Sequence, residues 1–148
     1  MRRVYTAWPL DKPDPGLRGA TKVWTPVLKV RVSTKHQFTP TIPAVVDSGS
    51  PYCLFKADVA QFLHIDLKSG PEGELGGVIG GPREPLYFHQ VNLVIENNWT
   101  ISVWAGFMKK LSVAAILGRS GFFDRFRVAF DHEKSPPEFE IQKIDLAN

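Results

Sequence analysis

Apolar residues in this chain occur in short runs separated by polar, glycine-containing and proline-containing stretches. Short runs rich in Val, Ile and Phe, bounded by turn residues, are typical of β-strands. The strands expected on this basis are 27–32, 44–46, 54–55, 91–95, 100–104, 113–117, 127–130 and 139–141, with a hairpin turn at 96–99. The pattern therefore predicts an all-β domain that is barrel-like in form.

Two short segments depart from the strand pattern. Val59, Phe62 and Leu63 recur at helical spacing, which predicts a short helix over 56–63. Residues 121–126 are expected to form one or two helical turns. The fold class is therefore all-β with one or two short helices.

The length of 148 residues and the hydrophobic fraction of 43% suit one compact domain with a core of its own. Residues 1–22 contain several prolines and glycines, among them Pro9, Pro13 and Gly19. Such residues interrupt regular structure, so we expect an irregular N-terminal arm over 1–22 and the folded domain over 23–148.

Charge and cysteine content narrow the class of protein further. The net charge is only +3 and the basic residues are dispersed, so no nucleic-acid surface is expected. Cys53 is the single cysteine, so an intrachain disulfide is impossible and nothing indicates an oxidising compartment. No apolar run resembles a signal peptide or a membrane span. These features predict a cytoplasmic protein, or the excised domain of a larger one, without a membrane partner.

The most informative motif is Val-Val-Asp-Ser-Gly-Ser at residues 45–50. Val45 and Val46 are expected to pack behind a tight turn that presents the Asp47 carboxylate. Gly49 lets the backbone turn sharply, and the Ser48 hydroxyl can donate a hydrogen bond that fixes the loop. A lone Asp-Ser-Gly is often an ordinary surface turn. Apolar residues on both sides of this one argue against a solvated turn and favour a loop that is packed against the core.

Peptide hydrolysis by carboxylates requires two of them. Like charges about 3 Å apart cannot both ionise, so one group keeps a proton while the other stays charged. The charged carboxylate takes a proton from water, and the protonated one donates a hydrogen bond to the scissile carbonyl. Asp-Ser-Gly occurs once in the chain, so the second carboxylate either comes from another copy or is a different aspartate of the same chain, the candidates being Asp58, Asp66, Asp124 and Asp131.

From Thr25 to Ile141 the chain resembles the retropepsin-like aspartic proteases, the retroviral-type family, and especially their bacterial single-domain relatives. The resemblance rests on the Asp47 turn, the helical segment 57–63, a glycine-rich segment followed by two strands, and the ordered stretch 116–131. It implies a closed β-barrel-like acid protease fold and aspartic endopeptidase activity. It also implies an obligate homodimer in which each subunit supplies one Asp47.

By the same resemblance, residues 116–118 (Ile-Leu-Gly) cross behind the catalytic loop and support it together with Arg119, Ser48, Gly49 and Ser50. Ile116 and Leu117 bury their side chains there, and Gly118 follows them. The resemblance implies that Arg119 forms an ion pair with an acid four residues after Asp47. That position is Pro51 in this chain, so Arg119 must have another partner or be solvated.

The glycine-rich segment before residue 85 is either a surface loop or the flap that the resemblance implies. It lacks Gly-Lys-Ser/Thr and the Gly-x-Gly-x-x-Gly spacing, so it is no phosphate loop. In the flap interpretation, glycines let the tip move over an extended peptide, and alternate side chains of that peptide enter apolar pockets. The flap and pocket residues are then Gly77, Val78, Ile79, Gly80 and Leu54, with Ile116 beside them.

Other residues suggest no further chemistry. The four histidines show no metal-ligand spacing with one another or with Cys53, so neither a metal nor another cofactor is expected. The expected partners are a second copy of the chain, with Glu140 and Ile141 contributing to the interface, and a peptide or protein substrate. The alternative is a non-catalytic peptide-binding or dimerisation module on the same fold, which the proline at position 51 supports.

Overall fold

The computed structural model describes residues 1–75 and 83–145. By their contacts the residues group into two compact units, Leu28–Asp124 and Met1–Val27 with Arg125–Asn148. The division therefore differs from a simple boundary after residue 22, because the last segment of the chain groups with the first.

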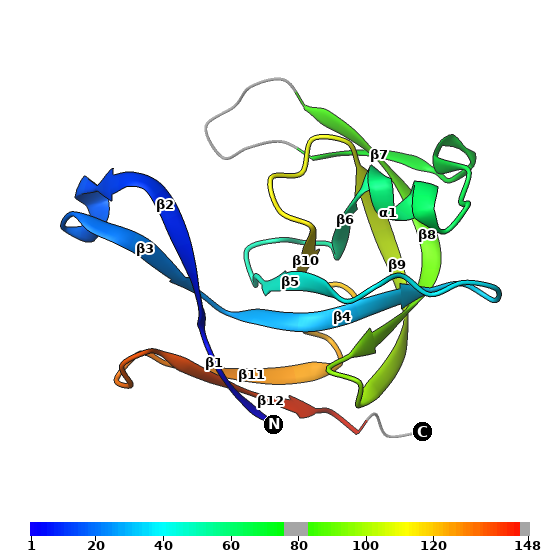
Figure 1. The fold of residues 1–148 in the computed structure, drawn as a ribbon. Coiled ribbons are helices and arrows are strands. Elements are labelled where there is room, and N and C mark those ends of the chain that lie inside the picture. The colour runs from blue at the N-terminus through cyan, green and yellow to red at the C-terminus, as the bar shows by residue number, and fades with distance from the viewer. Residues whose placement is uncertain (76–82, 146–148) are drawn as a thin grey trace. The chain divides into compact units, whose positions relative to one another are not determined.

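The larger unit is a closed barrel of six strands. The strands are β4 (Val27–Ser33), β5 (Ile42–Val46), β6 (Leu54–Lys56), β8 (Glu84–Ile95), β9 (Trp99–Met108) and β10 (Ala115–Leu117). They follow one another in the order β4-β5-β10-β6-β9-β8, and β8 pairs with β4 to close the ring (Figure 1). A further strand, β7 (Glu72–Leu75), pairs with β8 outside the ring. The prediction of an all-β, closed barrel is confirmed.

The β8–β9 hairpin illustrates how the sequence pattern produces the barrel wall. Alternate residues of β8 face the core, namely Val91, Leu93 and Ile95. Asn92 between them is exposed, as expected of a strand with one buried face. The turn is left-handed, with φ of 51° at Glu96 and 52° at Asn97. Both strands are longer than expected, because residues 87–90 pair with 104–107 although polar side chains interrupt the apolar pattern there.

The predicted helix over 56–63 is confirmed as α1 (Ala57–Phe62). Val59 and Ala60 face the core, and Asp58 lies in the first turn, where a carboxylate offsets the helix dipole. A short 3-10 turn, η2 (Leu67–Ser69), follows. None of the described helices is both long and apolar enough to cross a lipid bilayer.

The second expected helix, over 121–126, is wrong. Residues 121–125 form consecutive turns that lead into strand β11 (Phe126–Asp131). Gly121 has a φ of 109°, which a right-handed helix does not allow, and its N–H donates a hydrogen bond to Asp124 Oδ2 at 3.1 Å. Residues 121–125 are therefore a compact turn and not a helix.

The smaller unit contains the N-terminal segment, and the expectation of an irregular arm over 1–22 is wrong. Its elements there are β1 (Arg2–Val4), β2 (Thr6–Asp14), η1 (Pro15–Leu17) and β3 (Ala20–Thr25). β2 and β3 form a two-stranded antiparallel ribbon (Figure 1), with an irregular register between Pro9 and Asp14. Prolines are tolerated because each strand of such a ribbon has an outer edge that needs no N–H donor.

A three-stranded antiparallel sheet completes the smaller unit, in the order β1-β12-β11, with β12 (Glu138–Lys143) in the middle. The strands expected at 127–130 and 139–141 are thus confirmed. Phe139 and Ile141 are buried on one face, and the ring of Tyr5 lies edge-on to Phe130 and Phe139.

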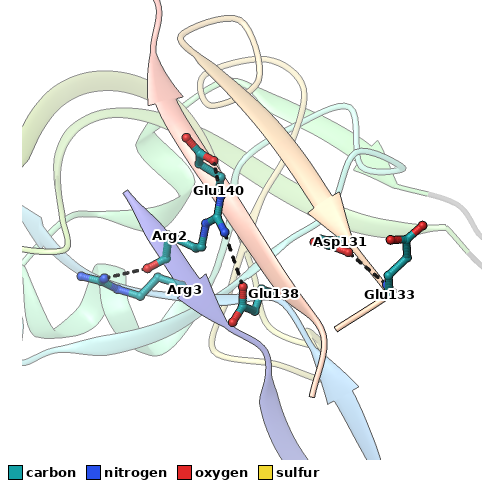
Figure 2. A network of polar contacts seen from close by, with 6 residues as sticks. All are labelled: Arg2, Arg3, Asp131, Glu133, Glu138 and Glu140. Carbon is teal, nitrogen blue, oxygen red and sulfur yellow. Dashed lines mark hydrogen bonds and ion pairs between the residues drawn. The ribbon is translucent and has the colours of Figure 1, made fainter. Parts of the chain in front are cut away.

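The opposite face of this sheet carries charged side chains (Figure 2). Arg2 pairs with Glu138 at 3.9 Å and with Glu140 at 3.2 Å. Asp131 accepts a hydrogen bond from the backbone N–H of Glu133 at 3.0 Å. Exposed ion pairs contribute only about 0–1 kcal/mol, so the apolar face supplies most of the stability of this sheet.

The barrel core gives the first testable prediction. Replacing the fully buried Leu93 (Leu93→Ala) leaves a cavity and should lower the free energy of unfolding by about 2–5 kcal/mol. Asn92→Ala, on the exposed side of the same strand, should change it by less than about 0.5 kcal/mol. Urea denaturation of both variants measures the difference, and equal effects would contradict the assignment of β8 faces.

Candidate active site

Asp47 lies just after β5, at the start of a tight turn. Its N–H donates to the carbonyl of Leu117 at 3.0 Å, and its own carbonyl accepts from the N–H of Ser50 at 3.2 Å. Oδ1 of the carboxylate accepts from the N–H of Gly49 at 2.9 Å. No other hydrogen bond to this carboxylate occurs within residues 1–75 and 83–145, and the side chain is only partly buried. Its second oxygen can therefore bind water or a ligand.

β10 holds this turn from behind, because it inserts between the strand that enters the turn and the strand that leaves it (Figure 1). It runs parallel to β5, with Leu117 opposite Val46, and antiparallel to β6. Past the end of β10, the N–H of Arg119 donates to the carbonyl of Ser50 at 2.9 Å. Residues 116–118 thus run beside the strands on both sides of the Asp47 turn, and their role as support of a catalytic loop stays a prediction.

Glycine occupies positions 118 and 49 near the turn for different physical reasons. Gly118 is buried, and a Cβ there would lie 2.0 Å from the carbonyl oxygen of Tyr52 and 2.7 Å from that of Ser50. A Cβ on Gly49 would lie 3.1 Å from Asp47 Oδ1, a contact that a small shift could relieve. Gly118 is therefore required for close backbone packing, whereas Gly49 only eases the turn.

Arg119 forms a hydrogen bond with the backbone instead of the ion pair with an acid that the resemblance implies. Its Nη1 donates a hydrogen bond to the carbonyl oxygen of Ser48 at 2.9 Å, while the side chain is exposed. Hydrogen bonds from a charged donor are stronger than neutral ones. The guanidinium therefore braces the Asp47 turn directly, and Pro51 leaves it no carboxylate at the usual position.

Ser50 and Tyr52 form a second brace on the outgoing side of the turn. The Ser50 hydroxyl donates to the carbonyl of Tyr52 at 2.7 Å and accepts from the N–H of Tyr52 at 3.4 Å. The Tyr52 ring lies edge-on to Phe88 at 5.1 Å, and Phe88 stacks on the exposed Trp104. Tyr52 and Phe88 were not predicted from the sequence, because both lie outside the strands expected at 54–55 and 91–95.

The proposed pocket residue Leu54 is 1% exposed. It packs in a cluster with Leu86, Met108 and Leu111, and Ile116 lies against the same cluster. In this structure its side chain belongs to the core beside the turn, and a contact with substrate stays a prediction.

The remaining flap residues, Gly77, Val78, Ile79 and Gly80, lie outside the described residues. The base of that segment is described, and it is an antiparallel hairpin in which β7 pairs with the first part of β8. Leu75 is paired with Glu84 at its last described rung.

Cys53 is a buried free thiol beside the turn. Burial raises its pKa to about 11; a backbone hydrogen bond at Gly118 acts in the opposite direction, and the charge of Asp124 adds to the rise. The thiol is therefore protonated at neutral pH and unsuited to nucleophilic catalysis. Asp47, by contrast, presents a partly exposed carboxylate.

Comparison with solved structures finds the same architecture elsewhere. A retropepsin-like aspartic protease from Rickettsia conorii aligns with a TM-score of 0.55 at 14% identity, over 77% of this chain and 89% of that one. EIAV protease complexed with the inhibitor HBY-793 gives a TM-score of 0.42 at 16% identity, over 64% of this chain and 82% of that one. The retroviral protease-like domain of Ddi1 from Leishmania major also gives 0.42 at 16% identity, over 63% and 72%.

No family model and no curated protein matches the sequence. The chain therefore has a retropepsin-like fold, as the sequence resemblance implied, and at these identities the likeness shows the fold alone.

The close approach at Gly118 gives a testable prediction. Gly118→Ala should lower the free energy of unfolding by about 1–3 kcal/mol or more, because the added methyl meets backbone atoms on a segment paired on both sides. Gly49→Ala, which meets only a side-chain oxygen, should cost clearly less. Thermal and urea denaturation compare the two, and an equal or reversed order would contradict the described packing.

The Cys53 thiol gives a prediction of pH dependence. Its pKa is about 11 in the folded chain against 9.0 for an unburied thiol, so folding favours the neutral form. The resulting stabilisation is present below pH 9 and is lost as the pH rises through 11, by up to about 2–3 kcal/mol. Urea denaturation from pH 8 to about 11 should show a steeper loss for the native chain than for Cys53→Ala. If the unfolding free energies of the two proteins fell in parallel with pH, the predicted contribution of the Cys53 thiol would be refuted.

Proposed function

We propose that this chain is an aspartic endopeptidase in which Asp47 is one half of a catalytic dyad. The observation that carries the proposal is the placement of Asp47. Its carboxylate is partly exposed and fixed through Oδ1, and β10 and Arg119 hold the turn that presents it. The retropepsin-like fold, shared with a solved aspartic protease from Rickettsia conorii, supports the same activity.

The proposed chemistry is general acid–base catalysis by two carboxylates that share one proton. The ionised carboxylate takes a proton from a bound water, and that water attacks the scissile carbonyl. The protonated carboxyl donates a hydrogen bond to the carbonyl oxygen and stabilises the developing negative charge. The two pKa values belong to the pair, since the groups titrate together. No metal or other cofactor takes part in this scheme.

The second carboxylate is Asp47 of another copy, so the active enzyme is a homodimer. Asp-Ser-Gly occurs once in the sequence, and a dyad needs two such turns facing each other. A twofold axis satisfies that need because it presents the same turn from both subunits. A cytoplasmic location remains a prediction from the sequence.

The proposed substrate is a peptide or protein bound as an extended strand. Such a substrate pairs its main chain with the enzyme and directs alternate side chains into pockets. The β7–β8 hairpin leads into the segment proposed as the flap, and Phe88 and Trp104 offer apolar surface close to Tyr52. We therefore expect a preference for apolar side chains beside the cleaved bond.

A second candidate is a non-catalytic peptide-binding or dimerisation module, and one observation favours it. Arg119 donates a hydrogen bond to the backbone carbonyl of Ser48. The resemblance implies an ion pair with an acid at position 51 instead, but that residue is Pro51. A peptide groove could persist with this arrangement even without turnover. Tight peptide binding without cleavage would identify this second function, whereas pepstatin-sensitive cleavage would identify the protease.

The decisive variant is Asp47→Asn, which keeps the shape of the side chain but cannot supply the ionised base. Cleavage of an unfolded casein-type substrate between pH 4 and 8 should fall at least about 1,000-fold, while the thermal unfolding temperature changes little. Asp58→Asn, an exposed aspartate in the first turn of α1, is the matched control and should retain full activity. Undiminished hydrolysis by Asp47→Asn would refute the assignment.

A further inference from the structure

The ribbon of β2 and β3 leaves one edge of β3 without a partner strand in the part of the chain that the structure describes. Pro9 of β2 lies opposite Lys22 of β3, and Trp8 lies opposite Val23. Because proline has no N–H, Pro9 and Lys22 cannot exchange two backbone hydrogen bonds, so the pair of Trp8 and Val23 does. Backbone direction alternates along a strand, so Lys22 and Trp24 direct their N–H and C=O groups to the open edge. Such an edge can receive an extended peptide as an additional strand.

A groove of about 490 Å³ is lined by β3, by η1 and by the segment between β11 and β12, all of them parts of the smaller unit. Its apolar surface comes from Leu17, Ala20, Trp24 and Pro137. Leu17 keeps 44% and Trp24 36% of its surface exposed. The volume lies within the range of pockets that bind ligands, about 300–1,000 Å³. The groove can therefore accept an apolar side chain of a peptide that lies along β3.

The charged groups that line the groove are all basic. Arg18 and Lys22 are exposed, and neither forms an ion pair within residues 1–75 and 83–145. Lys22 Nζ lies 4.8 Å from the centre of the Trp24 ring, a cation–π contact that places its charge beside the apolar surface. The nearest carboxylate along the chain, Asp14, is not part of the lining, and its Oδ1 accepts from the N–H of Gly16 at 2.7 Å. The groove is therefore complementary to a ligand that carries negative charge.

His132 adds a hydrogen-bonding group to the lining. Its Nε2 shares a hydrogen bond with the hydroxyl of Tyr5 at 2.9 Å, so Nδ1 is the ring nitrogen left for a ligand. When the Tyr5 hydroxyl donates to Nε2, the proton of the neutral ring is on Nδ1, which can then donate to a carboxylate. The imidazole thus supports the same choice of ligand as the two cations.

We propose that β3 and this groove form a docking site for an acidic peptide segment of a partner protein, bound antiparallel to β3 as an additional strand. Alternate side chains of that peptide lie on the groove side. Carboxylates at these positions meet Arg18 and Lys22, and an apolar side chain between them packs on Leu17 and Trp24. Antiparallel pairing is the arrangement with the more stable hydrogen bonds per residue. The site belongs to the smaller unit, so it does not depend on the activity proposed for Asp47.

The direct test is titration with a designed probe, the blocked peptide Thr-Glu-Thr-Leu-Thr-Glu-Thr. Its two Glu and its Leu share one face of a strand. The full-length Asp47→Asn chain is used so that the probe is not cleaved, and the probe should bind with a Kd below about 1 mM in isothermal titration calorimetry. A probe with Lys in place of both Glu should bind at least about tenfold more weakly. Absence of binding by the Glu probe, or equal binding of the two probes, would overturn the proposal.

A charge swap locates the site. In the double variant Arg18→Glu with Lys22→Glu, the preference should reverse, so that the Lys probe binds at least about fivefold more tightly than the Glu probe. Lys68→Glu with Lys109→Glu is the matched control, because it changes the net charge equally at exposed positions outside the groove. This control should keep the native preference. Circular dichroism verifies that both variants are folded, and a preference for the Glu probe that survives the groove substitutions would refute the site.

Methylated probes test the added strand. In antiparallel pairing the N–H of the central Leu of the probe faces β3, whereas the N–H of the Thr beside it faces solvent. Methylation of the Leu nitrogen should therefore weaken binding at least about tenfold, and methylation of the Thr nitrogen should change it by less than about threefold. Equal effects of the two methyl groups would contradict the pairing. Binding of the fatty acid dodecanoate by a chain that binds no peptide would assign the groove to a lipid and overturn the proposal.

Discussion

The placement of the candidate site depends on one constraint, the insertion of the short strand β10 between β5 and β6. Parallel pairing with β5 fixes the residue before Asp47, and antiparallel pairing with β6 fixes the strand that leaves the turn. This arrangement is possible only because Gly118 lets the loop backbone pass within a distance that any side chain would block. The carboxylate is therefore presented by a backbone that is hydrogen-bonded on both sides, and the proposed catalysis depends on a preorganised turn of this kind.

Elements with a regular spacing of apolar residues could be predicted from the sequence, whereas contacts between distant segments and the backbone conformation of single residues could not. The alternation in β8 and the apolar spacing of α1 derive from local side-chain direction, which sequence spacing reports. Pairing of β10 with β5 joins segments far apart in the chain and entered the analysis only through a family resemblance. Pro9 and Pro13 were read as signs of irregular structure, but a proline is compatible with a strand when its missing N–H lies on an unpaired edge, which the sequence does not reveal. The turn at Gly121 was not predicted, because the positive φ of Gly121 cannot be read from the sequence.

The candidate site shows the same division. Asp47, Gly118 and Arg119 were identifiable by residue type and order, but the partner of Arg119 was not, since a hydrogen bond to the Ser48 carbonyl uses backbone that every residue has. Leu54 was expected to face substrate and is found in the core, because the sequence does not distinguish a pocket wall from the cluster beneath it.

The central claim is that two copies of Asp47 act together, and a subunit-mixing experiment tests it most directly. Native chain is refolded with a ninefold excess of Asp47→Asn chain, at a concentration well above the dissociation constant of the dimer. If the dyad spans two subunits, random pairing leaves most native chains in inactive mixed dimers, and cleavage should fall to roughly a tenth of that of the same amount of native chain alone. Cleavage that is unchanged by the inactive chain would show that each subunit acts alone and would contradict the account.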